Sequence, residues 1–295
     1  MNLANKSVPA SATNAEANVK PQPGVEPSTK EMQDIARKLR RDVVVMIAQA
    51  NSGHPGGSLS AADIVTALYF KELRHDPSDP QAPDRDRFIL SKGHAAPILY
   101  AALAECGYFP KAALGTLRQV GSILQGHTDR TLTPGVEMSG GSLGQGLSFA
   151  VGNALGARLD NKSYRVYALL GDGECDEGQV WEAAMAAAHF KLDNLTAIVD
   201  HNGLQLDGSN SRIMNIEPLG DKWRSFGWHV IEADGHDFPS IFSALAEARQ
   251  TKGQPTAIIA LTVKGKGVSF MENNLDFHGR APNPEELAKA LKELS

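Results

Sequence analysis

The segment Arg165-Val166-Tyr167-Ala168-Leu169-Leu170-Gly171-Asp172-Gly173 decides the fold. Its apolar part predicts a buried strand over 165–170, and the glycines after it let the backbone approach a ligand closely. An Ala-rich helix is predicted from Gly178 to Phe190, followed by a second apolar strand over 195–199. Apolar strands that alternate with helices indicate a parallel sheet with helices on both faces.

The same alternation continues in both directions along the chain. Strands are predicted near 88–90, 228–233 and 256–262. Helices are predicted over 30–50, from a cap at Ser28 or Thr29, and from a cap at Ser60 to about 71. Further helices are predicted near 95–106, 110–119, 144–159, 240–252 and 284–293. The Gly- and Pro-containing run 51–57 predicts a loop. With no internal repeat and no linker, we expect one large α/β domain over 30–295.

Composition excludes several classes of protein. The 295 residues carry 29 Lys and Arg against 34 Asp and Glu, a net charge of −5, and 42% are hydrophobic. This balance is typical of a soluble globular protein, and its mild acidity argues against a general nucleic-acid binder. No apolar run reaches the roughly 18 residues of a membrane helix. The two cysteines are far apart and lack metal-binding spacing, which favours a reducing cytoplasm.

The first 29 residues differ from the rest of the chain. They are rich in Ala, Asn, Ser and Pro and contain almost no large apolar side chains, so we expect residues 1–29 to form a disordered tail. The segment has no apolar stretch typical of a secretory signal. It also lacks Arg and contains Glu16 and Glu26, unlike an organellar transit peptide.

Oxygen-bearing side chains follow two of the predicted strands. Asp172 comes directly after the strand 165–170, and Asn202 comes shortly after the strand 195–199. Open α/β sheets bind ligands at the carboxyl ends of their strands, and the start of the helix near Gly178 would favour an anion. A carboxylate, an amide oxygen and a nearby backbone carbonyl suit a hard cation such as Mg²⁺ or Ca²⁺, completed by phosphate oxygens. These residues therefore predict a metal-diphosphate site.

Several motifs resemble a known family when they are taken together. The GDG of 171–173 with Asn202 resembles the thiamine diphosphate motif. SGHPGG (52–57), SKGHAAP (91–97), GH (126–127), SGGSLGQG (139–146) and FHG (277–279) together resemble transketolase. Their order and spacing match from about Lys30 to Arg280, which is nearly the whole predicted domain.

The resemblance implies transfer of a two-carbon ketol unit between sugar phosphates, with thiamine diphosphate and Mg²⁺, Ca²⁺ or Mn²⁺. It implies that Asp172 and Asn202 bind the metal through their side chains and Leu204 through its backbone carbonyl. It places the catalytic histidines at His54, His94, His127 and His278. The residues that it places around the cofactor are Gly141, Leu143, Gly171, Asp172, Gly173, Glu177, Asn202, Lys264 and His278.

The four motif histidines also make chemical sense in themselves. Ketol transfer moves protons near neutral pH, and imidazole has an ordinary pKa of about 6.5. We expect His54 and His278 beside the breaking bond, His127 at the terminal hydroxyl and His94 near the diphosphate. A lone histidine is more often structural than catalytic, but all four lie next to glycine in predicted loops. We expect the other five to be structural or surface residues: His75, His189, His201, His229 and His236.

The chain is less than half as long as complete transketolases, and it matches only their diphosphate-binding part. From the resemblance, we expect the pyrimidine-binding domain, its activating glutamate and the sugar-phosphate pocket to be supplied by another chain. We therefore expect a split transketolase, a glycolaldehyde transferase that is active only with a C-terminal partner subunit, in an α2β2 heterotetramer. The Gly-rich run 143–156 has no strand before it, so we interpret it as a subunit-contact helix rather than a dinucleotide site.

Three alternatives remain open. The first is the α-subunit of a thiamine-dependent 2-oxo acid dehydrogenase, and the second is a 1-deoxyxylulose phosphate synthase fragment. The third is a non-catalytic thiamine diphosphate-binding protein. A redox role for Cys175 is disfavoured because no second cysteine is near it in the sequence. The motifs do not name the sugars, so a role in the pentose phosphate pathway is only the default expectation.

Overall fold

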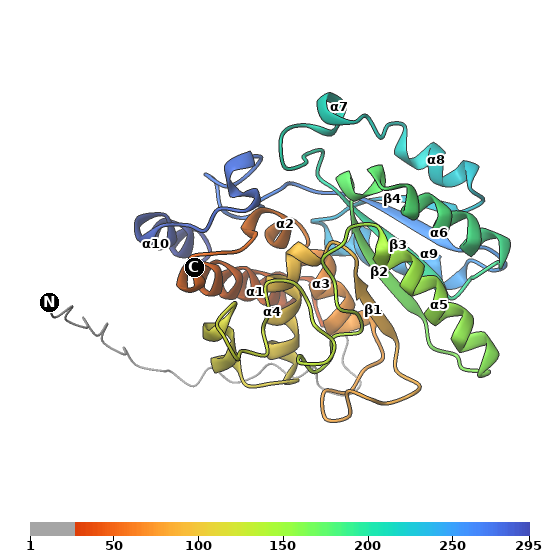
Figure 1. Cartoon of the computed structure of the whole chain (residues 1–295), viewed down its shortest axis with the longest axis horizontal. Helices are drawn as coiled ribbons and strands as arrows, with labels where there is room; N and C mark the ends of the chain where they lie inside the picture. Colours follow the sequence, from red (N-terminus) through yellow and green to blue (C-terminus); the bar gives the residue numbers. More distant parts are fainter. Residues whose placement is uncertain (1–26) are drawn as a thin grey trace, which may run out of the picture.

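A five-stranded parallel sheet forms the centre of the computed structural model, which describes residues 27–295 (Figure 1). Its strands lie in the order β1-β2-β3-β5-β4. They span Arg87–Leu90 (β1), Val166–Gly171 (β2), Leu195–His201 (β3), His229–Asp234 (β4) and Thr256–Leu261 (β5). The predicted parallel sheet of an α/β protein is confirmed, and every strand ends at the same edge.

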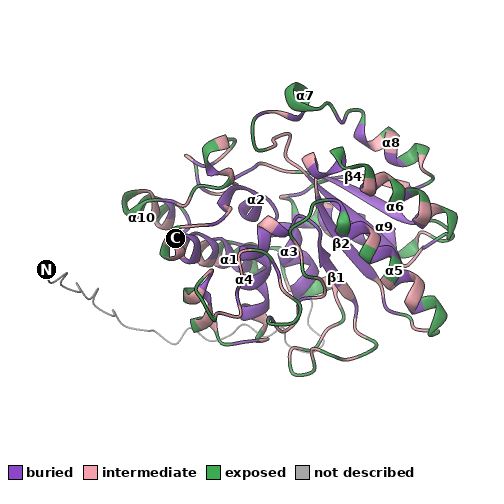
Figure 2. Ribbon diagram, viewed as in Figure 1, coloured by how far each residue is buried: buried purple, intermediate pink, exposed green. Residues whose placement is uncertain are grey.

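Four of the five strands are buried on both faces, whereas the edge strand β4 is only partly buried. Along β2, Val166, Ala168 and Leu170 belong to one hydrophobic core, and Tyr167 and Leu169 belong to the other. This alternation follows from the two-residue period of a strand. Figure 2 shows most of the sheet in purple, the colour of buried residues, at the centre of the molecule. Such two-sided burial explains why the strands are continuous apolar runs in the sequence.

Helices cover the sheet on both faces, as predicted. One face carries α1 (Thr29–Ala50), α3 (Ala62–Ala67), α4 (Ala96–Cys106) and α9 (Phe238–Gln250). The other face carries α5 (Gln145–Leu159), α6 (Gly178–His189) and α8 (Leu219–Ser225). The remaining elements are α2 (Pro55–Ser60), η1 (Leu68–Glu72), η2 (Gly93–Ala95), η3 (Lys111–Thr116), η4 (Gly173–Asp176), α7 (Asn210–Ile213), η5 (Leu275–His278) and α10 (Pro284–Glu293).

The first helix begins where its capping residues predict. The Ser28 hydroxyl accepts from the Glu31 backbone, and the Glu31 carboxylate accepts in return from the Ser28 backbone at 2.7 Å. This reciprocal capping box satisfies two backbone donors that a helix start leaves free. Residues 1–26 of the predicted tail lie outside the described residues. Thr29, which was predicted as the last residue of the tail, is the first residue of α1.

Three local predictions need correction. The second helix begins at Pro55, inside the run predicted to be a loop, and Ser60 is its last residue instead of its cap. The helix predicted over 110–119 is the short 3-10 helix η3. The short helices α7 and α8 were not predicted. Within residues 27–295, none of the helices combines the length and the apolar character that crossing a membrane requires.

Candidate active site

The carboxyl edge of the sheet holds a cavity of about 220 Å³. Asp172 follows β2, Asn202 follows β3, Lys92 follows β1 and Lys264 follows β5, so four neighbouring strands contribute a polar side chain. The residues around the cavity are Gly57, Lys92, His94, Leu143, Gly171, Asp172, Gly173, Glu174, Asn202, Leu204, Gln205, Leu206, Lys264 and His278. Nearly all of the residues expected around a diphosphate therefore come together here.

Backbone amides fix the orientation of the Asp172 carboxylate. One of its oxygens accepts from the Gly173 amide at 2.8 Å, and the other accepts from the Gly203 amide at 2.6 Å. Asp172 is only 2% exposed. Burial and the neighbouring Asp200 carboxylate raise its pKa, and the two amides oppose that rise. A buried carboxylate with raised pKa gains from a nearby cation.

Two of the three predicted metal ligands, Asn202 and Leu204, lie in the short loop after β3, and Asp172 lies after the neighbouring strand β2. The Asn202 side-chain oxygen accepts from the Leu204 amide at 3.1 Å, which turns the loop back over the end of β3. The Leu204 carbonyl accepts from the Lys264 ammonium at 3.1 Å. Among residues 27–295, no group of three or more His, Cys, Asp or Glu side chains is placed to hold a metal ion. The donor set is thus one carboxylate, one amide and one carbonyl, which fits a hard cation that takes its other ligands from phosphate and water.

Lys264 lies buried at the base of the cavity and is only 2% exposed. Its ammonium donates to the Leu204 carbonyl at 3.1 Å, the Gln205 carbonyl at 3.3 Å and Nδ1 of His278 at 2.9 Å. Burial and the nearby Lys92 lower its pKa to about 8. A cation that is costly to bury is well placed to neutralise an anionic group in the cavity.

The four motif histidines form one cluster, although they come from four separate segments: His54 precedes α2, His94 lies in η2, His127 lies in a loop and His278 ends η5. The ring of His54 is central, with centroids 5.5 Å from His94, 6.2 Å from His127 and 5.6 Å from His278. His94 and His278 stack at 5.3 Å. His94 and His278 line the cavity, and His54 and His127 extend the cluster beyond it.

All four imidazoles favour their neutral form. Burial, followed by the charge of Arg118, lowers the pKa of His54 to about 4. Burial, followed by the charge of Lys264, lowers the pKa of His278 to about 3. The pKa values of His94 and His127 are also lowered, mainly by burial. A neutral imidazole offers one donor and one acceptor, so near neutral pH the cluster can both donate and accept hydrogen bonds.

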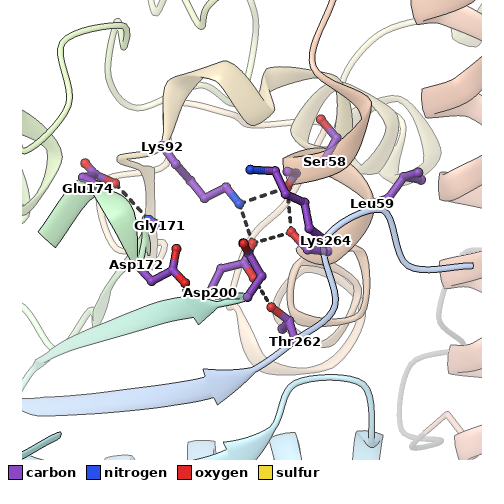
Figure 3. A network of polar contacts seen from close by, with 12 residues as sticks. Ser58, Leu59, Lys92, Gly171, Asp172, Glu174, Asp200, Thr262 and Lys264 are labelled. Carbon is purple, nitrogen blue, oxygen red and sulfur yellow. Dashed lines mark hydrogen bonds and ion pairs between the residues drawn. The ribbon is translucent and has the colours of Figure 1, made fainter. Parts of the chain in front are cut away.

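Sequence reasoning missed a buried ionic network beneath the cavity (Figure 3). The Lys92 ammonium contacts the Asp200 carboxylate and donates to the Gly57 carbonyl at 2.9 Å. Asp200 also accepts from the hydroxyls of Ser60, at 2.6 Å, and Thr262. Burial alone would raise the pKa of Asp200, but Lys92 and the hydroxyls outweigh it and leave the pKa lowered. The network joins the end of β3 and the loops after β1 and β5 to α2.

Glu174 is a second missed residue. It lies in the loop after β2 with 2% exposure, and its carboxylate accepts from the Gly144 amide at 2.8 Å and the Gly171 amide at 3.0 Å. The Ser91 hydroxyl donates to the same carboxylate. Burial raises the pKa of Glu174, and these three donors oppose the rise. The only sequence signal was its place within the GDG loop, because its partners are distant along the chain.

Some predicted residues lie apart from the cavity wall. Gly141 is exposed beside the His127 ring, and Glu177 is exposed at the start of α6. Burial raises the pKa of Cys175 well above that of a free thiol, which agrees with the view that it has no redox role. The histidines expected to be structural lie outside the cluster. Among them, His236 contacts Asp63 at 2.7 Å and His201 contacts Glu217 at 2.8 Å.

Comparison with known proteins agrees with this geometry. A sequence profile described as "Transketolase, thiamine diphosphate binding domain" matches residues 29–295. A 6-deoxy-6-sulfo-D-fructose transketolase subunit from Clostridium sp. strain MSTE9 is 46% identical, over 90% of this chain and 96% of the relative. An apulose-4-phosphate transketolase subunit from Phocaeicola vulgatus is 41% identical, over 90% of this chain and 94% of the relative.

Solved structures give the same result. The crystal structure of transketolase from Campylobacter jejuni matches with a TM-score of 0.86 and 34% identity. The match covers 91% of this chain and 43% of the Campylobacter chain, so this protein corresponds to less than half of that enzyme. From the matched residues, the sheet and the cavity, we conclude that the chain belongs to the transketolase family.

Proposed function

We propose that this chain is the diphosphate-binding subunit of a two-chain transketolase, which moves a two-carbon ketol group from a ketose phosphate to an aldose phosphate. The observation that carries the proposal is the cluster of four neutral imidazoles beside the cavity that holds Asp172 and Asn202. A diphosphate site and a group of proton carriers, side by side, suit thiamine-dependent transfer of a hydroxylated carbon unit.

The size of the cavity supports a second chain. Its volume of about 220 Å³ is below the roughly 300–1,000 Å³ of a complete small-molecule site. The two relatives that this chain covers almost fully are named as subunits, whereas the Campylobacter enzyme is more than twice as long. We therefore propose a C-terminal partner subunit with the pyrimidine-binding domain, its activating glutamate and the sugar-phosphate pocket.

The residues present fit thiamine diphosphate with Mg²⁺, or Ca²⁺ or Mn²⁺ in its place. Asp172, Asn202 and the Leu204 carbonyl would hold the metal, and the buried Lys264 would neutralise diphosphate charge. Gly173, which has no side chain to hold a ligand away from the backbone, would lie beside the diphosphate. When bound, the cofactor supplies the means to stabilise a carbanion at the carbon that changes partner. Further contacts are proposed for Gly141, Leu143, Gly171, Glu177 and His278.

The proposed proton steps belong to this chain. His54 and His278 would hold the hydroxyl groups next to the breaking carbon–carbon bond, and take and return their protons. His127 would hydrogen-bond the terminal hydroxyl of the transferred unit, and His94 would hold the diphosphate side. Their low pKa values keep these rings neutral near pH 7, so each ring offers the substrate hydroxyls one hydrogen-bond donor and one acceptor.

The choice of sugars would depend largely on the partner. Xylulose 5-phosphate as donor and ribose 5-phosphate as acceptor, the pentose phosphate pathway pair, are the default proposal for this EC 2.2.1.1-like enzyme. The relatives named for sulfofructose and apulose phosphate make other ketoses worth testing. We further propose an α2β2 assembly that works in the cytoplasm, where the free thiols Cys106 and Cys175 would stay reduced.

Reconstitution tests the proposal directly. The chain is purified alone and with a candidate C-terminal transketolase subunit, in thiamine diphosphate and Mg²⁺, and ketol transfer is followed with pentose, sulfofructose and apulose phosphates. We expect turnover only in the mixture, and a His54→Asn mixture that still binds cofactor but turns over about a hundredfold more slowly.

Two results would contradict the proposal. Normal turnover by the single chain would remove the need for a partner. A stable, cofactor-bound complex without turnover on any of these sugars would instead favour the non-catalytic alternative. The matched control is His189→Asn, because His189 is an exposed histidine on α6 outside the cluster.

A further inference from the structure

Arg118 reaches the histidine cluster from a loop that belongs to none of the motifs. Its guanidinium donates to the Ser52 hydroxyl at 3.0 Å and to the Gly126 carbonyl at 3.3 Å, and lies 3.5 Å from Nδ1 of His54. Ser52 is two residues before His54, and Gly126 directly precedes His127. One side chain therefore joins the loops of two histidines.

The backbone at Arg118 is unusual for a residue with a side chain. Its φ is +61°, in the left-handed region that favours glycine, and it is held there by a hydrogen bond from its amide to the Leu124 carbonyl at 2.9 Å. Such a conformation costs about 1–2 kcal/mol for an ordinary residue. A large side chain in a costly conformation is a reason to look for a role.

Gly126 is shaped for the guanidinium. A Cβ at this position would lie 3.0 Å from Cζ and 3.1 Å from Nε of Arg118, tighter than most real contacts, so the guanidinium would have to shift by a few tenths of an ångström. The glycine therefore lets the planar guanidinium lie against the backbone just before His127. The φ of Gly126 lies outside the left-handed region, so the constraint on a side chain at this position is the close approach of the guanidinium and not the backbone conformation.

We propose that Arg118 is a positioning residue of the active site, whose guanidinium fixes the His54 loop relative to the His127 loop and sets the tautomer of His54. Nδ1 of His54 faces a group that can only donate, so the proton of the neutral ring lies on Nε2, available for substrate. The proposed effect of Arg118 on catalysis rests on the proposed function. Its proposed effect on the titration of His54 and His127 does not.

The positive charge of Arg118 also favours the neutral form of the two histidines that its guanidinium joins. After burial, it is the strongest influence that lowers the pKa of both His54 and His127. The other charged or titratable groups that face His54 are His94, His127, His278 and Lys264. Removing Arg118 should raise the pKa of both histidines, and lysine should keep the charge without the forked contacts.

The test compares Arg118→Asn, Arg118→Lys and Gly126→Ala with the unchanged full chain. Asparagine tolerates a positive φ, so Arg118→Asn should fold with an almost unchanged melting temperature. Histidine ring NMR titration of the chain alone needs neither cofactor nor partner. We expect the His54 and His127 midpoints to rise in Arg118→Asn and to stay low in Arg118→Lys.

The reconstituted enzyme supplies the second measurement. We expect kcat to fall about a hundredfold in Arg118→Asn and about tenfold in Arg118→Lys and Gly126→Ala, with KM little changed. Arg224→Asn, on exposed α8, is the control and should match the unchanged protein.

Unchanged midpoints together with unchanged kcat would overturn the proposal. A rise in KM with kcat unchanged would also overturn the proposal, because it would indicate that Arg118 binds substrate directly. If the unchanged complex shows no ketol transfer at all, the proposed function fails. The titrations would still decide whether Arg118 controls the two histidines.

Discussion

At the scale of single residues, the protein keeps imidazoles neutral where free histidine would begin to take up protons. The pKa is about 4 for His54 and about 3 for His278. In the unfolded chain both would titrate near 6.5, so between that pH and about 4 the unfolded state binds more protons. The free energy of unfolding should therefore fall as pH is lowered through this window, by roughly 2–3 kcal/mol at pH 4.5 after allowance for solvent screening.

Urea unfolding of the chain near pH 7 and pH 4.5 measures this loss. Carboxylates also titrate in this range, so the informative quantity is the difference between variants. His278→Asn should lose less stability on acidification than the unchanged protein, whereas exposed His189→Asn should lose the same amount. Equal losses in all three proteins would contradict the low pKa of His278.

At the scale of elements, the Lys92–Asp200 pair connects the ends of β1 and β3. Lys92 is 1% exposed and Asp200 is 0% exposed. Lys92→Met would leave the Asp200 carboxylate buried without its cation, and such a loss costs about 3–5 kcal/mol. We expect a fall of that size in the free energy of unfolding, measured with urea at neutral pH.

An exposed ion pair provides the matched comparison. Arg224 and Asp221 are 2.7 Å apart, but their side chains are 49% and 66% exposed, so Arg224→Met should cost at most about 1 kcal/mol. Adding Asp200→Asn to Lys92→Met should recover part of the loss, because the unpaired charge is removed. Similar costs for Lys92→Met and Arg224→Met would show that burial does not strengthen the pair.

The elements also show how far the sequence could lead. The strands were predictable because two-sided burial makes them apolar runs, and Ser28 with Glu31 marks the first helix. The start of α2 at Pro55 was predicted wrongly, because Pro and Gly usually end helices. Here Pro55 occupies a favourable first-turn position, and a Cβ at Gly57 would come 3.1 Å from the His94 ring. Tertiary packing therefore determines where α2 begins.

Tertiary contacts also explain why some site residues were predicted from the sequence and others were missed. Asp172, Asn202 and the four histidines could be found because each belongs to a short motif. Lys92, Glu174 and Arg118 act through partners that are distant along the chain, as Glu174 does with Gly144 and Ser91. Such contacts exist only once the strands are side by side. Lys92 lies inside the motif 91–97 and Glu174 directly follows the GDG, but these motifs do not show which partners the two side chains meet.

At the scale of the whole molecule, the site looks like one half of a larger one. The cavity is small, and Leu143 and Leu206 on its wall are 37% and 60% exposed. Apolar side chains exposed beside a cavity are typical of a surface that another chain covers. The proposed C-terminal subunit would cover this edge, which leaves α5 and α6, on one face of the sheet, available for a second copy of this chain (Figure 1).

The last prediction concerns that second contact. Phe149 on α5 is 37% exposed, Met185 on α6 is 59% exposed, and a Cβ at Gly152 between them in sequence would meet no atom within 4 Å. If two copies pack there, Phe149→Asp with Met185→Asp should split the α2β2 complex into αβ pairs, since buried unpaired charges are costly. Light scattering of the reconstituted complex would show the mass fall by half. Val120→Asp, at a fully exposed loop position, should leave the mass unchanged. An intact α2β2 mass in the double variant would place the contact between copies on another face.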